Sequence, residues 1–251
     1  MLISLLSSGL DTRTMITYIV IDILVMLISF SIHEWGHAYA AHKMGDDTAR
    51  NMGRMTLNPI AHIDPIGMLM LLVFGFGWAK PVPVNPRNYT NYRKGEFLVS
   101  FAGIFMNLML ALFAALASCA IAMIDLNSAG APIVSGLVQG LSTVRLFAEF
   151  PKEVYMFFYI LGVTNCALAV FNFIPVYPLD GSHIFLLVFG KLIGAKAIMW
   201  VQRHGRIILY AFLGLSLVLS RVFGISIIGD AAGWIYGRFV ALFSLLAGVF
   251  A

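Results

Sequence analysis

His33-Glu34-Trp35-Gly36-His37 lies in an apolar stretch that begins well before it, over residues 16–32. Two histidines four residues apart on a helix project from one face, so both imidazoles can bind one Zn²⁺ ion. Glu34 is rotated about 100° from His33 on such a helix, which places its carboxylate beside the metal instead of on it. In this spacing the glutamate is the expected general base. The pattern therefore predicts metal ligands at His33 and His37 and a base at Glu34.

The composition is that of an integral membrane protein. Of the 251 residues, 60% are hydrophobic and only 11% are charged, whereas soluble domains carry about 25% charged residues. Ionisable residues inside a membrane span are costly and mark functional sites by default. The alternative is a chance match whose histidines form hydrogen bonds between helices.

Apolar segments of sufficient length predict about five transmembrane helices, near residues 14–42, 97–124, 154–174, 207–223 and 225–250. Residues 67–78 are apolar but too short to cross comfortably, and glycines and prolines follow as far as Pro86. They favour a re-entrant or interfacial segment that is β-hairpin-like. The predicted fold class is an all-α polytopic membrane protein of about five transmembrane helices plus this segment, in one membrane-embedded domain over residues 1–251.

The distribution of basic residues predicts the orientation. Segments 43–96 and 190–206 are basic and are expected in the cytoplasm, whereas 125–153 is near-neutral and expected outside. The N-terminus is then outside and the C-terminus cytoplasmic. This topology requires that the short apolar segment does not cross, and it places the two histidines near the cytoplasmic side.

A catalytic zinc site needs a third protein ligand. Asp22 is roughly 16 Å along the helix from His33 and cannot share its metal, and Asp125 and Asp230 lie near the outer ends of predicted spans. Asp180 combines a suitable depth with a break in the chain, since Pro175 and Pro178 precede it and Gly181 follows. The alternative is a simple Asp-Gly turn at the membrane surface. His183, three residues later, either supports the site or is a plain interfacial histidine.

Five stretches together resemble the site-2 protease family of intramembrane zinc metalloproteases, in its compact bacterial branch that lacks a PDZ domain. They are His33–His37, Asn172-x-x-Pro175-x-x-x-Leu179-Asp180-Gly181, Gly53–Pro59, Phe76–Pro86 and Gly103-x-x-x-Asn107. The resemblance covers about residues 14–190, which we take as the catalytic core. Residues 207–250 carry no motif of the family and are predicted to be accessory C-terminal helices.

The resemblance implies a role for each site residue. His33, His37 and Asp180 would bind one Zn²⁺ per chain, and Glu34 would activate water. Asn172 would stabilise the oxyanion or hold the substrate backbone, and Asn107 would contact substrate or order the site. An extended edge within residues 67–86 would accept substrate by strand addition, the alternative being a plain packed hairpin.

The implied function is hydrolysis of a peptide bond in the transmembrane segment of a membrane protein, as in regulated intramembrane proteolysis of an anti-sigma factor or of a signal-peptide remnant. The expected partners are single-span membrane protein substrates and the lipid bilayer, with no nucleic acid, and the expected location is the plasma membrane. The alternatives are a divalent-metal transporter and a catalytically silent membrane scaffold. A transporter would depend only weakly on Glu34.

The predicted orientation is testable by cysteine labelling. A cysteine introduced at Asn91 should react with a membrane-impermeant reagent only from the cytoplasmic side, and one at Ser128 only from outside, because the two lie in the basic and the near-neutral segment. The opposite pattern at both positions would contradict the predicted topology, in which the short apolar segment does not cross the membrane.

Overall fold

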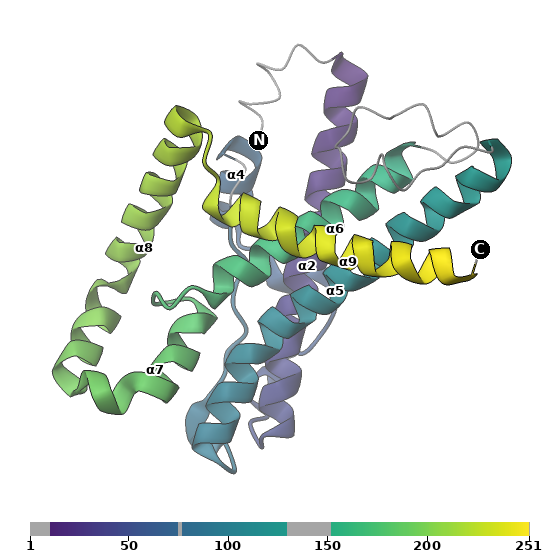
Figure 1. Ribbon diagram of the computed structural model, residues 1–251. Coiled ribbons are helices and arrows are strands. Elements are labelled where there is room, and N and C mark those ends of the chain that lie inside the picture. Colours follow the sequence, from purple (N-terminus) through teal and green to yellow (C-terminus); the bar gives the residue numbers. More distant parts are fainter. Residues whose placement is uncertain (1–10, 75–76, 130–151, 251) are drawn as a thin grey trace.

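The structure, a computed structural model, describes residues 11–74, 77–129 and 152–250 (Figure 1). Its elements in chain order are α2 (Thr12–Lys43), α3 (Thr48–Asn51), the 3-10 helix η1 (Pro59–His62), α4 (Pro65–Phe74), the 3-10 helix η2 (Pro86–Asn88), α5 (Tyr92–Ala129), α6 (Lys152–Phe173), α7 (Asp180–Ile193), α8 (Ala195–Phe223) and α9 (Ile227–Phe250). Most of the predicted outer loop at 125–153 lies outside the described residues. Its two described ends are helical.

Three of the described helices are long and apolar enough to cross a membrane: Thr12–Lys43, Tyr92–Ala122 and Glu153–Phe173. They agree with the first three predicted spans. The other two predicted spans are helical, in α8 and α9, but their crossing of the membrane is not confirmed. Segment 190–206, which we expected as a basic loop, is almost entirely helical, because after Gly194 only one glycine and no proline interrupts it up to Arg206.

The short apolar segment contains α4, a helix of ten residues. Extended chain follows at residues 79–85. The β-hairpin predicted here is not confirmed, because the part of the segment that the structure describes has no named strand and only one isolated antiparallel bridge, between Ile63 and Ala79. Pro81 and Pro83 remove two backbone donors from this stretch, which limits regular pairing.

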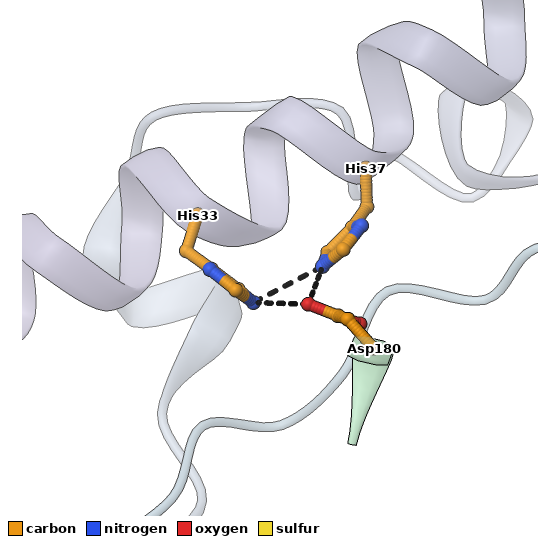
Figure 2. A group of neighbouring side chains, drawn as sticks. All are labelled: His33, His37 and Asp180. Carbon is orange, nitrogen blue, oxygen red and sulfur yellow. Dashed lines mark hydrogen bonds and ion pairs between the residues drawn. The ribbon is translucent and has the colours of Figure 1, made fainter. Parts of the chain in front are cut away.

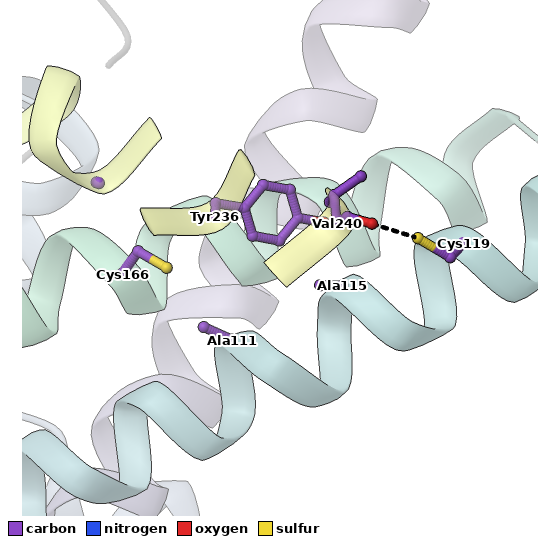
Figure 3. Close-up of a cluster of buried hydrophobic side chains, with 7 residues drawn as sticks. Ala111, Ala115, Cys119, Cys166, Tyr236 and Val240 are labelled. Carbon is purple, nitrogen blue, oxygen red and sulfur yellow. Dashed lines mark hydrogen bonds between the residues drawn. The ribbon is translucent and has the colours of Figure 1, made fainter. Parts of the chain in front are cut away.

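Helices α2, α5 and α6 pack against one another, and α9 lies across α5 and α6 (Figure 1). Small side chains make the crossing close: Ala111 and Ala115 of α5 and Ala232 of α9 are fully buried beside Tyr236 (Figure 3). Small residues let membrane helices approach closely. Cys119 and Cys166 are buried, free thiols in the same cluster, where they act as small packing residues.

Helix α7 packs on α5 and α6, while α8 extends away from the bundle and contacts α7 (Figure 1). Gly194 separates α7 from α8 with φ of +82°, and Gly224 ends α8 with φ of +67°. Such backbone conformations favour glycine, because a Cβ atom would be strained there. Asp180 is the first residue of α7, the helix that packs on α5 and α6.

Residues 79–90 form a segment that runs along α2, here named the strap. Its Lys80 N–H donates to His62 O at 2.9 Å, and its Thr90 N–H donates to Met44 O at 2.8 Å. Arg54 donates to the carbonyl oxygens of Lys80 and Pro81, at 2.8 and 3.2 Å. The strap is therefore fixed at both ends to the loop that follows α2.

Asp46 is the buried centre of this attachment. Its side chain is fully buried and accepts from Asn85 N–H at 2.6 Å, from the Asn88 side-chain amide at 2.8 Å and from the Thr48 hydroxyl and N–H. Burial raises the pKa of Asp46, but these donors lower it more, so that its pKa lies below 3.8. The carboxylate is thus ionised at neutral pH and ties the strap to α3.

Replacing Asp46 should loosen the strap. We expect Asp46→Ala to lower the free energy of unfolding by about 2–4 kcal/mol, because several buried donors lose an ionised acceptor. The control is Asp47→Ala, since that neighbouring side chain is 49% exposed and should change stability by less than about 1 kcal/mol. Thermal unfolding in detergent micelles compares the two variants.

The stabilisation of the folded state by Asp46 depends on pH in a defined way. Because the folded-state pKa of Asp46 is lowered, its stabilisation is complete above the ordinary value of 3.8 and is lost as the pH falls through the folded-state pKa. Equal effects of the two substitutions at neutral pH would contradict the role given to Asp46.

Candidate metal centre

Helix α2 presents His33 and His37 on one face, as their spacing predicts. Their Nε2 atoms lie 3.0 Å apart, and the two rings meet edge to face (Figure 2). Each residue is 9% exposed. Two polar rings in this apolar helix are therefore almost wholly removed from solvent.

Asp180 reaches the same point from the start of α7. Its Oδ2 atom lies 3.4 Å from His33 Nε2 and 3.3 Å from His37 Nε2 (Figure 2). Gly181 makes this possible, because a Cβ atom there would lie 2.2 Å from the carbonyl oxygen of Phe173. Only glycine lets α7 begin so close to the end of α6.

Both histidines are oriented through their other ring nitrogen. His37 Nδ1 donates to the carbonyl oxygen of Val99 at 2.7 Å, and His33 Nδ1 donates to Asn107 Oδ1. These acceptors place the proton of each neutral ring on Nδ1 and leave a lone pair on Nε2. The two Nε2 lone pairs and Asp180 thus face one another across a small gap.

This donor set fits a tetrahedral metal ion. Ligand atoms bound tetrahedrally at about 2.0–2.2 Å lie roughly 3.3–3.6 Å from one another, and the three observed separations are 3.0, 3.3 and 3.4 Å. Asp180 Oδ2 is buried and has no hydrogen-bond partner among the residues that the structure describes. A buried acceptor left unpaired beside two nitrogen lone pairs is costly unless a cation lies among them. Within the described residues, these three side chains form the one such cluster.

Helix α5 leaves room for the cluster at Gly103. A Cβ atom there would lie 2.4 Å from His37 Nε2 and 2.5 Å from His33 Cε1. Any side chain would displace the imidazoles, so Gly103 allows α5 to pass directly behind them. Asn107, one turn later on the same face of α5, then reaches His33.

Glu34 lies under the strap. It is 7% exposed, and its Oε2 accepts from the N–H of Val82 at 2.7 Å. Pro81 and Pro83 have no N–H, so Val82 is the strap's donor at this point. No hydrogen bond to Oε1 of Glu34 is found among the described residues, and this oxygen remains available for a proton.

The two asparagines of the predicted site lie in different settings. Asn107 is fully buried. Its Oδ1 accepts a hydrogen bond from His33, and its Nδ2 donates one to Asn165. Of its two predicted roles, this geometry matches ordering of the site. Asn172 is half-buried, and its side-chain amide donates to Leu168 O in its own helix at 3.0 Å. The structure does not bring Asn172 into the cluster.

His183 faces Glu96 at the start of α5, with 2.8 Å between Nδ1 and Oε1. This hydrogen bond raises the pKa of His183, against the effect of its burial. Glu96 was not foreseen from the sequence, since an acidic residue near a helix start is common.

Asn165 and Ser29 were also not singled out. Both are fully buried within helices that can span a membrane, and both belong to a hydrogen-bond chain that leads to His33. The available signal was a polar side chain in the middle of an apolar span.

Comparisons with known proteins agree with this site. The sequence matches peptidase family M50 over residues 21–212. It is 39% identical over 162 residues to "Putative zinc metalloprotease YwhC" of Bacillus subtilis (strain 168), an alignment that covers 64% of this chain and 66% of that protein. It is 31% identical over 109 residues to "Putative zinc metalloprotease Rip2" of Mycolicibacterium smegmatis, with 40% and 42% covered. No solved structure matches the chain.

Each alignment spans less than two thirds of the relative's own length. The family match is more extensive and includes both histidines, Glu34, Asn107, Asn172 and Asp180. The resemblance found from the sequence motifs is thereby confirmed: the chain belongs to peptidase family M50, the site-2 protease family.

Proposed function

We propose that this protein is an intramembrane zinc metalloprotease, which hydrolyses a peptide bond in the transmembrane segment of a membrane protein. The observation that carries the proposal is the convergence of His33 Nε2, His37 Nε2 and Asp180 Oδ2, with the buried carboxylate of Glu34 on the residue next to His33. The cluster is built on a helix that is long and apolar enough to cross a membrane. Both named relatives are described as zinc metalloproteases.

In this proposal His33, His37 and Asp180 hold one Zn²⁺ ion per chain and leave a fourth position open. When bound, zinc supplies Lewis acidity, lowering the pKa of water toward about 7 and polarising a carbonyl group. Asp180 contributes the one negative charge among the ligands. The Nδ1 hydrogen bonds of both histidines keep Nε2 directed at the metal.

Glu34 acts as the general base. Its Oε2 is held by the Val82 N–H, which fixes the carboxylate and leaves Oε1 to accept the proton of the attacking water. Glu34 then returns that proton to the leaving amine. A glutamine at this position retains the shape and cannot accept a proton.

Asn172 is proposed to stabilise the oxyanion or to hold the substrate backbone. One of its amide hydrogens donates to Leu168 O, and the other is directed elsewhere by the planar amide geometry. A neutral donor in this role contributes typically a few kcal/mol of transition-state stabilisation.

The substrate is proposed to bind in extended form beside the strap, because a helix hides its own carbonyl groups. The N–H groups of Lys80 and Val82 already donate within the protein, and Pro81 and Pro83 have none. Arg54 already donates to the carbonyl oxygens of Lys80 and Pro81, so a substrate strand would pair mainly through the later carbonyl oxygens of the strap and the Val84 N–H. The proposed partners are single-span membrane proteins in the plasma membrane, with the site near the cytoplasmic side.

Co-expression with candidate single-span substrates tests the proposed activity. Wild-type protein should shorten a substrate within its transmembrane segment, and Glu34→Gln should leave it intact. If neither wild-type protein nor Glu34→Gln shortens any candidate substrate, although the wild-type protein holds its full complement of zinc, the result would favour a silent scaffold.

Metal content separates the role of Glu34 from that of Asp180. Purified wild-type protein and Glu34→Gln should each hold one Zn²⁺ per chain, whereas Asp180→Asn should bind zinc at least about 10–100-fold more weakly, because a neutral amide replaces an anionic ligand. Both variants should lose cleavage. Chelator competition and elemental analysis, performed beside the cleavage assay, measure the difference.

Two outcomes would contradict these assignments. If Asp180→Asn binds zinc as tightly as wild type, Asp180 is not the third ligand. If Glu34→Gln cleaves at nearly the wild-type rate, Glu34 is not the base.

A further inference from the structure

A chain of buried side-chain hydrogen bonds joins the three central helices to His33. Ser29 of α2, Asn107 of α5 and Asn165 of α6 are each 0% exposed. Asn107 Nδ2 donates to Asn165 Oδ1 at 2.7 Å, and Asn165 Nδ2 donates to Ser29 Oγ at 2.8 Å. Polar groups buried in apolar helices are costly unless they are fully paired, so the pattern of pairing constrains each member.

The direction of every bond in the chain follows from two backbone carbonyl groups, those of Leu161 and Val25. The carbonyl oxygen of Leu161 can only accept, and Asn165 Nδ2 lies 2.8 Å from it. Ser29 donates its hydroxyl hydrogen to Val25 O at 2.6 Å, so its oxygen is left to accept from Asn165. Both contacts require the NH₂ group of Asn165 on that side. The Oδ1 atom of Asn165 must then face Asn107.

Asn107 is oriented in turn. Because Asn165 offers an acceptor, Asn107 directs its NH₂ group toward Asn165 and its Oδ1 toward His33. An amide oxygen can only accept, so the adjacent His33 nitrogen, Nδ1, carries the proton. The Nε2 atom of His33 is thereby left with a lone pair facing Asp180.

We propose that Asn165 is a positioning residue that sets the tautomer of His33 through Asn107. This inference rests on the proposed zinc site. Without an acceptor at position 165, the amide of Asn107 has no reason to keep its oxygen toward His33. The reversed amide would donate to His33 Nδ1 and favour the tautomer with its proton on Nε2, which cannot bind a metal.

His37 provides an internal comparison. Its Nδ1 proton is held by the carbonyl oxygen of Val99 in the backbone of α5. A carbonyl oxygen cannot reverse its role, so the tautomer of His37 is independent of Asn165. Substitution of Asn165 should therefore change the tautomer of His33 and leave the tautomer of His37 unchanged.

The test uses the whole protein in detergent micelles. Asn165→Leu removes the acceptor at similar volume, and Asn165→Asp restores it, since a buried neutral acid accepts from Asn107 and donates to Ser29 or Leu161. Ser118→Ala is the matched control. Ser118 is a buried hydroxyl of α5 whose interhelical partner is Tyr236, 3.1 Å away in α9, and no hydrogen bond within the described parts of the chain joins it to His33.

Two measurements are made on each protein. Nitrogen-15 chemical shifts of labelled histidine in metal-free protein report the tautomers of His33 and His37, and chelator competition reports the affinity for Zn²⁺. Asn165→Leu should populate the Nε2–H tautomer of His33 alone and weaken zinc binding by about 10-fold or more. Asn165→Asp should restore both properties to near wild type, and Ser118→Ala should change neither.

Folded Asn165→Leu with an unchanged His33 tautomer and wild-type zinc affinity would overturn the proposal. So would equal changes at His33 and His37, because they indicate general loosening of the bundle. If Asn165→Leu does not accumulate, Asn165→Ala removes the same acceptor without crowding and is judged by the same outcomes.

Failure of the zinc site itself gives a different result. If wild-type protein binds no stoichiometric zinc, the proposed function fails, while the tautomer measurement on metal-free protein still decides the role of Asn165.

Discussion

Two imidazole nitrogens and a carboxylate oxygen face one another within 3.4 Å inside an apolar helix bundle. Such a group of lone pairs is unfavourable in a low-dielectric interior unless a cation neutralises it, and removing ionisable groups from water is costly in itself. The surrounding helices offset part of this cost. Their backbones lie close to the cluster and hold its side chains by hydrogen bonds. The structure can be understood as the set of contacts that keeps this cluster in place.

Two kinds of contact serve that purpose. Glycines at 103 and 181 bring α5 and the start of α7 within reach of the histidines. The chain from Ser29 through Asn165 and Asn107 then fixes one imidazole, while the backbone of α5 fixes the other. Glu34 is oriented from the opposite side by the strap, which Asp46 ties to the loop after α2. Helix α5 thus holds both imidazoles, and the strap holds Glu34.

Patterns local in the sequence predicted the candidate metal-binding residues and three of the helices. The spacing of His33 and His37 determines a shared helix face, and the break before Asp180 indicated a side chain that could turn inward. The three apolar helices α2, α5 and α6 followed from length and hydropathy. Asn107 and Asn165 are 58 residues apart in the sequence, and no local pattern predicts that they pair. The predicted hairpin is not confirmed: the described part of that segment has one isolated bridge, and the strap is held by single backbone hydrogen bonds at its two ends and by side-chain contacts.

X-ray absorption at the zinc edge of the zinc-loaded protein tests most directly whether these three side chains bind the metal. The expected spectrum has two imidazole nitrogens at about 2.0–2.1 Å and oxygen ligands at about 2.0–2.2 Å, in a four-coordinate site. Asp180→Asn should alter the oxygen shell while the two imidazoles remain in any zinc still bound. Sulfur scattering at about 2.3 Å, from Cys119 or Cys166, or a spectrum without imidazole, would contradict the site described for this chain.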